Sequence, residues 1–311
     1  MGLVAVAALG LVACSRGGQS SSTDSSTKAA IITDTGGVDD KSFNQSAWEG
    51  LQAWGKENGL TKDNGFTYFQ SNSESDYATN LSSAADQGYN LILGVGFGLH
   101  DAVSDAAEDN EDLNYVIIDD VIEDRDNVES VLFADNEGAY LAGVAAAMQS
   151  KTGKIGFVGG VTSDTITRFQ AGFEEGAKSV KSDIEIQVQY AESFSDSAKG
   201  NTIASTMYSS GVDVIYQAAG GTGTGVFTAA KEINEKLDAD SDQKVWVIGV
   251  DRDQTEEGNY TSADNKESNF VLTSTIKQVG NVVRDIANGQ VKGETFNGGE
   301  TETYEIGRAH V

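Results

Sequence analysis

The feature that most constrains this chain is a regular alternation of two kinds of segment. Short runs rich in β-branched residues alternate with longer segments in which apolar residues recur every three to four positions, such as 40–56, 136–149 and 275–289. This alternation is typical of βα units, in which helices cover a parallel sheet. The strands that we predict lie at 29–33, 66–70, 90–95, 114–118, 130–134, 154–159, 184–190, 213–218, 245–250 and 269–274.

These strands are too many for one small sheet, and the pattern restarts at residues 153–160 (GKIGFVGG). We therefore predict an α/β protein with two similar lobes, each a parallel sheet flanked by helices. Lobe 1 comprises residues 28–136 together with 275–311, and lobe 2 comprises residues 137–274. A ligand is expected in the cleft between two such lobes.

The first residues of the chain resemble a bacterial lipoprotein leader. Residues 2–13 form an uncharged apolar run that is too short to span a membrane, so we interpret residues 1–13 as a signal peptide. The run ends in Leu-Val-Ala-Cys, which resembles a lipobox and predicts lipidation of Cys14; a chance cysteine in an apolar leader is the alternative. Residues 14–27 are Ser-rich and predict a flexible tether. The expected location is the bacterial cell membrane, on its extracytoplasmic side.

Charge and histidine content exclude several functions. The chain has 21 Lys plus Arg against 48 Asp plus Glu, a formal charge of −27, which repels nucleic acids. Its only histidines are His100 and His310, which removes most routes to histidine-based catalysis and to multi-histidine metal sites. We therefore expect no nucleic-acid partner, no catalytic residue, no metal and no cofactor.

Aspartates follow several of the predicted strands. Asp34, Asp119 with Asp120, and Asp251 each come directly after an apolar run. Ligands of open parallel sheets bind at the carboxyl ends of the strands, and a carboxylate near a core needs hydrogen-bond donors. The pattern predicts acceptors that converge on an uncharged, donor-rich ligand, such as one with sugar hydroxyls. The alternative is that each aspartate caps the following helix or turn.

Aromatic residues occupy matching positions in the two lobes. Residues 39–42 are interpreted as the N-cap and first turn of a helix, which places Phe43 and Asn44 at its mouth. Phe194 follows the predicted strand 184–190 in the second lobe, so the two rings are expected to stack on opposite faces of a flat group. Packing within each lobe is the alternative, and Tyr216 is the other candidate for the second ring.

Two further positions are candidates for the cleft. The glycine repeat that begins at Gly220 is interpreted as a tight strand-to-helix turn whose backbone approaches the ligand. Lys277, placed on the first turn of the predicted helix 275–289, is either a ligand-binding cation or an exposed surface lysine.

Nine blocks spread over nearly the whole of residues 28–289 form a recognisable set: 33–51, 94–97, 116–120, 133–146, 156–160, 168–177, 193–200, 218–227 and 247–254. Together they resemble the basic membrane protein family of substrate-binding lipoproteins, in particular its PnrA-like purine nucleoside receptors. The resemblance implies a type I periplasmic-binding-protein fold and delivery of adenosine, guanosine or inosine to an ABC transporter permease. It also implies that Phe43 and Phe194 sandwich the purine, that Asn44 and Asp119 or Asp120 bond its polar edge, and that Asp34, Asp251 and Lys277 hold the ribose.

The leading hypothesis is thus a lipid-anchored receptor that captures a purine nucleoside between its lobes for an ABC importer. A receptor of the same fold for a sugar or another polyol is the first alternative. A nucleoside hydrolase that uses one of the aspartates as a base or metal ligand is the second.

Overall fold

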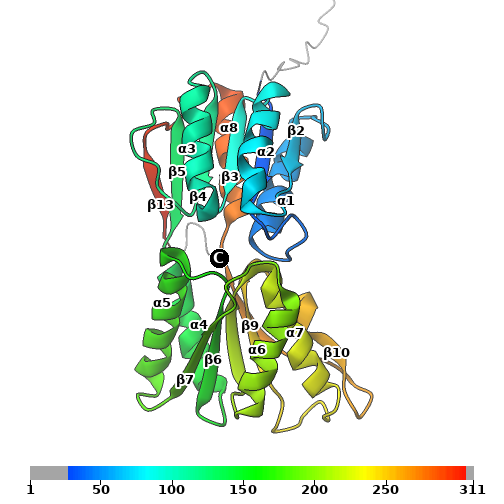
Figure 1. Ribbon diagram of the computed structural model, residues 1–311. Helices are drawn as coiled ribbons and strands as arrows, with labels where there is room; N and C mark the ends of the chain where they lie inside the picture. The colour runs from blue at the N-terminus through cyan, green and yellow to red at the C-terminus, as the bar shows by residue number, and fades with distance from the viewer. Residues whose placement is uncertain (1–26, 306–311) are drawn as a thin grey trace, which may run out of the picture.

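The computed structural model describes residues 27–305 and consists of two α/β lobes, one above the other in Figure 1. The predicted signal peptide, Cys14 and nearly all of the predicted tether lie outside the described residues. Within residues 27–305, no helix is both long enough and apolar enough to cross a membrane. The predicted fold class, two parallel sheets flanked by helices, is confirmed.

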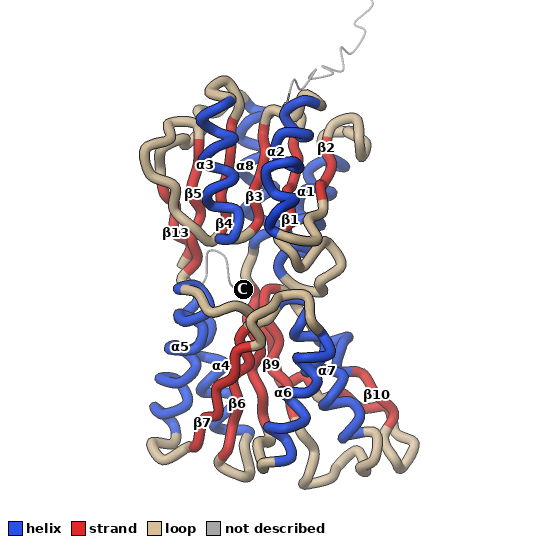
Figure 2. Tube along the Cα trace, in the orientation of Figure 1, coloured by secondary structure: helices blue, strands red, loops and turns tan. Residues whose placement is uncertain are grey.

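The first lobe contains a parallel sheet of 6 strands in the order β13-β5-β4-β3-β1-β2. Helices α1 and α8 pack on one face of this sheet, and α2 and α3 pack on the other (Figure 2). The bounds are β1 (Ala29–Thr33), β2 (Phe66–Phe69), β3 (Leu91–Val95), β4 (Asn114–Ile118), β5 (Val128–Phe133), β13 (Thr301–Tyr304), α1 (Phe43–Glu57), α2 (Tyr77–Asp86), α3 (His100–Asp109) and α8 (Val279–Lys292).

The second lobe repeats this arrangement with 5 strands in the order β12-β9-β8-β6-β7. Helices α4 and α5 cover one face, α6 and α7 cover the other, and a small antiparallel hairpin, β10–β11, extends from the lobe. The bounds are β6 (Lys154–Gly159), β7 (Glu185–Tyr190), β8 (Val214–Ala218), β9 (Trp246–Asp251), β12 (Val271–Ile276), α4 (Asp135–Gln149), α5 (Asp164–Val180), α6 (Ser197–Ser209), α7 (Gly220–Asn234), β10 (Asn259–Thr261) and β11 (Glu267–Asn269).

Two crossings between the lobes lie next to each other. The first joins β5 to α4 through Ala134, and the second joins β12 to α8 through Lys277 and Gln278. The prediction for the second crossing was wrong in detail, because β12 continues to Ile276 and α8 begins only at Val279. Residues 275 and 276 are kept extended by the parallel pairing of β12 with β9, an interaction that local periodicity does not reveal.

Helices α4 and α5 approach each other unusually closely. A Cβ added to Gly176 on α5 would lie only 1.9 Å from the carbonyl oxygen of Tyr140 on α4, and one added to Gly143 would lie 2.1 Å from the carbonyl oxygen of Phe173. Glycine is therefore required here by backbone-to-backbone contact. This contact lets the apolar helix α4 cover the sheet directly beside the first crossing.

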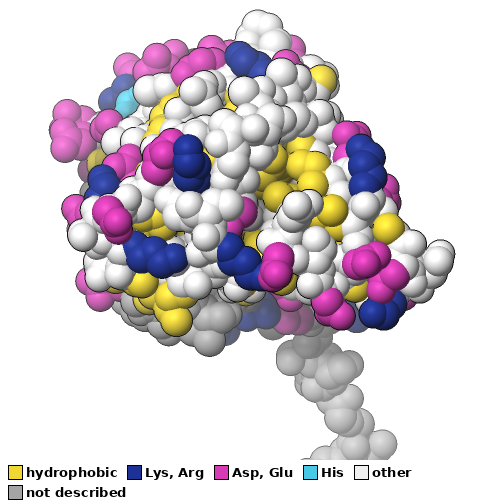
Figure 3. All heavy atoms as spheres, turned by 90° about the horizontal axis from the view of Figure 1, so that it is seen from below, with side chains coloured by type: hydrophobic (Ala, Val, Ile, Leu, Met, Phe, Trp, Pro, Cys, Tyr) yellow, Lys and Arg dark blue, Asp and Glu magenta, His cyan; other side chains and the backbone are white. Residues whose placement is uncertain are grey.

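The surface carries both signs of charge. On the face seen in Figure 3, Lys and Arg side chains occur as separate spots among Asp and Glu side chains, with no continuous basic area. Because the whole chain has a formal charge of −27, its long-range field is negative.

Candidate functional site

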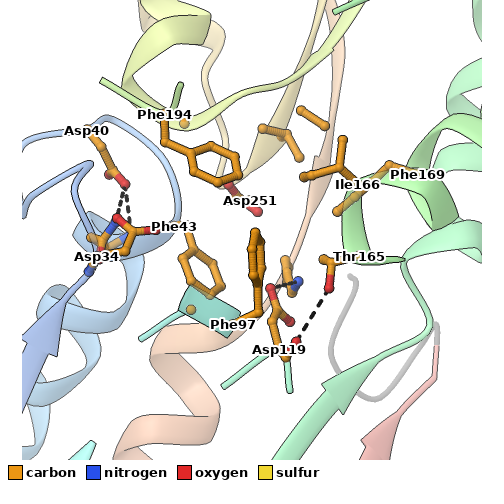
Figure 4. A pocket seen from close by; sticks show the side chains of 16 residues that line it. Asp34, Asp40, Phe43, Phe97, Asp119, Thr165, Ile166, Phe169, Phe194 and Asp251 are labelled. Carbon is orange, nitrogen blue, oxygen red and sulfur yellow. Dashed lines mark hydrogen bonds and ion pairs between the residues drawn. The ribbon is translucent and has the colours of Figure 1, made fainter. Parts of the chain in front are cut away.

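A cavity lies between the two lobes, at the carboxyl ends of strands from both sheets (Figure 4). The lining is a mixture of aromatic rings, apolar side chains and carboxylates. The residues are Asp34, Asp40, Phe43, Asn44, Gly96, Phe97, Asp119, Thr165, Ile166, Phe169, Phe194, Ala218, Gly220, Val250, Asp251 and Lys277.

A hydrogen-bonded group at the end of β1 forms one polar wall of the cavity. Oδ1 of Asp34 accepts bonds from Nδ2 of Asn44 and from the backbone N–H of Gly36, both at 2.7 Å. Nδ2 of Asn44 also donates to Oδ2 of Asp40 at 2.9 Å. Asn44 therefore links two carboxylates and fixes the direction in which Asp34 points.

The carboxylate of Asp40, three residues before α1, accepts backbone N–H groups at the start of this helix. Its Oδ2 accepts the backbone N–H of Asn44 at 2.9 Å, and its Oδ1 accepts that of Ser42 at 2.8 Å. The interpretation of residues 39–42 is confirmed for the N-cap, which is Ser42, and for the place of Phe43 and Asn44 at the start of α1. It was wrong for the first turn, because α1 begins only at Phe43, and Ser42 makes no capping bond with its side chain. The carboxylate of Asp40 takes the capping role instead.

Asp119 and Asp251 share an uncommon backbone conformation. Their φ angles are +71° and +67°, in the left-handed region, which costs a non-glycine residue about 1–3 kcal/mol and is concentrated at ligand sites. The conformation turns the chain sharply at the end of β4 and β9. Among the described residues, Oδ1 of Asp119 is buried without a hydrogen-bond partner, whereas Oδ2 of Asp251 accepts from Ser42 Oγ of the other lobe.

Lys277 lies on the second crossing and is 1% exposed. Its Nζ is 2.6 Å from Oδ2 of Asp119 and 3.1 Å from Oδ1 of Asp135. The ammonium group also lies 5.2 Å from the ring centre of Phe43 and 4.9 Å from that of Phe133, within cation–π range. Lys277 is thus neither an exposed lysine nor a helix residue. Its ammonium group compensates the carboxylates of Asp119 in lobe 1 and of Asp135 at the start of α4 in lobe 2.

Four phenylalanine rings line the open space, namely Phe43, Phe97, Phe169 and Phe194. Figure 4 shows Phe43 and Phe97 from the first lobe and Phe194 from the second facing the same cavity. The rings of Phe97 and Phe194 are 6.1 Å apart with their planes inclined at 69°, an edge-to-face contact between the lobes. A Cβ on Gly160 would lie 2.1 Å from the ring of Phe194, so this glycine provides the room that the ring occupies.

Burial alters the acid–base properties of the cavity. Removal from water raises the pKa of Asp34 to about 7, against the lowering effect of its bond from Gly36. Burial likewise raises the pKa of Asp251 to about 7, although Lys277 opposes the shift. Burial alone lowers the pKa of Lys277, but the carboxylates of Asp119, Asp135 and Asp251 reverse this effect and raise it, so the lysine stays charged.

The structure brings most of the predicted site residues together. The cavity lining includes Asp34, Phe43, Asn44, Asp119, Phe194, Gly220, Asp251 and Lys277. Asp120 is not part of this lining, and its Oδ2 lies 3.0 Å from Nδ1 of the partly exposed His100. Tyr216 is fully buried within lobe 2, where its hydroxyl lies 2.8 Å from Thr275 Oγ1, so it is not the second ring.

The glycine repeat does not form the predicted turn. Residues 220–225 are the first turns of α7, and only Gly220, with φ at +54°, lines the cavity. A Cβ on Gly225 would lie 1.9 Å from the carbonyl oxygen of Ser197, so this glycine permits close packing of α7 on α6.

Several lining residues escaped the sequence analysis. Phe97 follows the end of β3, at the same edge of the sheet as the aspartates. The argument that ligands bind at the carboxyl ends of parallel strands would therefore have found it too. Thr165, Ile166 and Phe169 lie on the first turns of α5 and have no such signal, because only the packing of α5 against the crossing places them there.

The arrangement is suited to binding an uncharged ligand with a flat apolar part and several donor groups. In residues 27–305, no group of at least three His, Cys, Asp or Glu side chains is placed to hold a metal ion.

Comparison with known proteins decides the family. The family model described as "ABC transporter substrate-binding protein PnrA-like" matches residues 27–311. The chain belongs to the PnrA-like family of ABC transporter substrate-binding proteins.

Named relatives of this PnrA-like protein agree with the assignment. It is 61% identical over 290 residues to the ABC transporter nucleoside-binding protein BmpA of Lactococcus lactis subsp. cremoris, covering 93% of this chain and 82% of the relative. It is 51% identical over 283 residues to the CD4+ T-cell-stimulating antigen of Listeria monocytogenes, covering 91% and 78%. Among solved structures, an ABC transporter solute-binding protein from Aeropyrum pernix matches with a TM-score of 0.77 and 27% identity, covering 91% of this chain and 75% of that one. The predicted family is therefore confirmed.

Proposed function

We propose that this PnrA-like protein captures a purine nucleoside, namely adenosine, guanosine or inosine, between its lobes and presents it to the permease of an ABC importer. The observation that carries the proposal is the buried Oδ1 of Asp119, an acceptor with no donor among the described residues, in a cavity walled by aromatic rings. A buried acceptor without a donor costs about 1–3 kcal/mol, and a ligand that donates to it recovers that free energy.

The rings and the carboxylates suit different parts of a nucleoside. Phe43 and Phe194 come from different lobes, so a planar base between them would be held from both faces only when the lobes are together. Asn44 and Asp119 are assigned to the polar edge of the base. Asp34, Asp251 and Lys277 are assigned to the ribose, whose hydroxyls donate to carboxylates and accept from the ammonium group.

The carboxylates also predict which ligands are rejected. Asp34, Asp40, Asp119 and Asp251 line the cavity, and Lys277, the cation in its lining, is already paired. A 5′-phosphate would bring negative charge against these acids, so nucleoside monophosphates are excluded by repulsion. Free sugars would satisfy the carboxylates but leave the rings without a partner.

We place the protein at the extracytoplasmic face of a bacterial membrane, anchored through a lipid on Cys14 after removal of residues 1–13. The two lobes are proposed as the bodies that close on the ligand, with residues 135–136 and 275–276, predicted in lobe 1, moving with lobe 2 as parts of α4 and β12. The crossings at Ala134 and at Lys277 and Gln278 are the points about which they would move. Mass spectrometry of the protein isolated from bacterial membranes, before and after Cys14→Ala, tests the anchor.

Isothermal titration calorimetry tests the ligand class. Titrations with inosine, guanosine and adenosine are compared with titrations with their 5′-monophosphates, ribose and galactose. Binding of a nucleoside at least 100-fold tighter than that of its monophosphate and of ribose is expected. Equal affinity for the monophosphate contradicts the charge argument, and preference for the free sugars favours the polyol receptor. Free base released from inosine during a long incubation would instead indicate a hydrolase.

A further inference from the structure

The two lobes also bond to each other outside the ligand cavity, through the segment after β9 and the start of α1. Gln254, which is 3% exposed, belongs to lobe 2 and does not line the cavity. Its Nε2 donates to the backbone carbonyl oxygen of Lys41 in lobe 1 at 2.8 Å. This bond joins residues that are 213 positions apart in the sequence, and it exists only while the lobes are together.

Gln254 is held rigidly on the lobe 2 side. Its Oε1 accepts from the backbone N–H of Val250 at 2.9 Å and from Nε2 of Gln217 at 2.9 Å. Gln217 lies on β8 and is fully buried. The Nε2 donor of Gln254 is therefore aimed at lobe 1 by the core of lobe 2 and loses little side-chain entropy when the lobes meet.

A second interlobe contact lies beside the first. Nη2 of Arg252 is 3.0 Å and 3.1 Å from the two carboxylate oxygens of Glu49 on α1. Nε2 of Gln45, one turn earlier on α1, donates to Oε1 of the same carboxylate at 2.9 Å. Neither Arg252 nor Glu49 lines the cavity, and both are partly exposed.

We propose that Gln254 and Arg252 form a closure latch: two positioning residues that hold lobe 2 against the start of α1 and do not touch the ligand. The latch acts where α1 presents Phe43 and Asn44 to the cavity, so it also fixes the segment that carries them. The inference rests on the proposed function, since it makes the latch a determinant of how long a bound nucleoside is retained.

The latch favours the closed form without contributing a ligand contact. A bond made only in the closed form shifts the open–closed equilibrium, and the apparent affinity follows the fraction of molecules that are closed. Loss of one such bond is expected to weaken binding by about fivefold, which corresponds to roughly 1 kcal/mol. The change is expected in the dissociation rate, because the ligand leaves when the lobes open.

Two variants break the latch in different ways. Gln254→Glu keeps an oxygen acceptor for Val250 and Gln217 but loses the donor to Lys41 and places a carboxylate against a carbonyl. Arg252→Gln removes the paired contact to Glu49 at a partly exposed position, where the fold of lobe 2 is not at risk.

The matched control is Arg125→Gln. Arg125 pairs with Glu108 entirely within lobe 1, and its side chain is 27% exposed, against 28% for Arg252. This control removes an arginine–glutamate pair of similar exposure without touching an interlobe contact.

Two readouts are taken on the full chain. Stopped-flow fluorescence measures the dissociation rate of inosine, and small-angle X-ray scattering measures the radius of gyration with and without inosine. We expect both latch variants to release inosine about fivefold faster than the wild type and Arg125→Gln, with a larger radius of gyration at subsaturating inosine. Dissociation rates equal to that of Arg125→Gln overturn the latch.

Failure of the proposed function is distinguishable from failure of the latch. If the wild type binds no nucleoside, the proposed ligand class fails, and X-ray scattering of the ligand-free proteins still tests the latch. A larger radius of gyration for both latch variants than for Arg125→Gln then supports the latch, and equal radii overturn it.

Discussion

Nζ of Lys277 lies 2.6 Å from Oδ2 of Asp119, and the two side chains are 1% and 7% exposed. The lysine belongs to the crossing between β12 and α8, whereas the aspartate directly follows β4, 158 positions earlier in the sequence. Nζ of Lys277 also lies 3.1 Å from Oδ1 of Asp135, the first residue of α4, which directly follows the other crossing. These ion pairs join a wall of the cavity to the connections about which the lobes would move.

Replacing Lys277 by methionine is expected to destabilise the protein by about 3–5 kcal/mol, because two buried carboxylates lose their cation. Urea unfolding followed by circular dichroism measures the change. Lys178→Met is the control, since Lys178 pairs with Glu174 on the exposed side of α5 and is expected to contribute at most about 0.5 kcal/mol. Adding Asp135→Asn to Lys277→Met should restore part of the stability, because it removes one uncompensated carboxylate. If stability is not restored, the loss comes from altered packing and not from uncompensated charge.

Asp251→Asn is expected to weaken inosine binding by about tenfold or more, a loss of about 1.4 kcal/mol, because a neutral amide is a poorer acceptor for ribose hydroxyls. Asparagine tolerates the left-handed backbone that this position adopts, so folding should be preserved. Calorimetry with inosine and 2′,3′-dideoxyinosine tests the assignment. The loss should be smaller for the dideoxy ligand, and Asp120→Asn should bind inosine like the wild type. Equal losses for both ligands would remove Asp251 from the ribose site.

Phe194→Ala is expected to reduce nucleoside affinity by about tenfold or more through loss of one face of the base sandwich, about 1.4 kcal/mol. Phe43→Ala should have a similar effect from the opposite lobe. Leu141→Ala serves as a control, because this side chain is 56% exposed on α4, away from the cavity. A folded Phe194→Ala protein with unchanged affinity for guanosine would contradict the sandwich.

Stability is expected to fall as the pH rises from about 5 to about 8. The pKa values of Asp34 and Asp251 are raised by burial to about 7, above the ordinary value of 3.8, so between these values the folded state binds more protons than the unfolded chain. The free energy of unfolding therefore decreases with rising pH in that window, by up to about 1.4 kcal/mol per pH unit for each group.

Urea unfolding at pH 5, 6, 7 and 8 measures this dependence. Asp34→Asn removes one of the titrating groups and should give a shallower decrease. The same slope in the variant and in the wild type would show that Asp34 does not titrate in this range.

Gly176→Ala should destabilise lobe 2 by about 1–3 kcal/mol although alanine is the better helix former, since the new Cβ would lie 1.9 Å from the carbonyl oxygen of Tyr140. Thermal unfolding compared with that of Glu175→Ala, an exposed change on the same helix, measures the effect. If Gly176→Ala is as stable as Glu175→Ala, then α4 and α5 can move apart without a loss in the free energy of unfolding.

The strands that are buried on both faces were the most accurately predicted elements. The strands β1, β4 and β6 were predicted with their observed bounds, because continuous apolar runs between polar segments leave few alternatives. In contrast, β13 reads TETY and was not predicted, since an edge strand with partly exposed side chains needs no apolar run. Pairing with β5 makes it a strand.

The candidate site was predictable where a residue follows an apolar strand or lies at the start of the next helix, and not on the later positions of helix faces. Asp34, Asp119 and Asp251 were identified by their positions after apolar runs, and all of them line the cavity. Phe169 and Thr165 lie on a helix face that reads as ordinary packing, so the sequence contained no comparable signal for them.

The linear order of residues by itself determined the two-sheet α/β class, the family and the residues that follow each strand, because these depend on local spacing and on motifs. Only the tertiary structure decided that Lys277 is buried between Asp119 and Asp135, that Asp120 lies outside the cavity lining, and that Gln254 reaches Lys41. Those contacts join residues far apart in the chain, and their distances depend on how two folded lobes meet, which no local periodicity encodes.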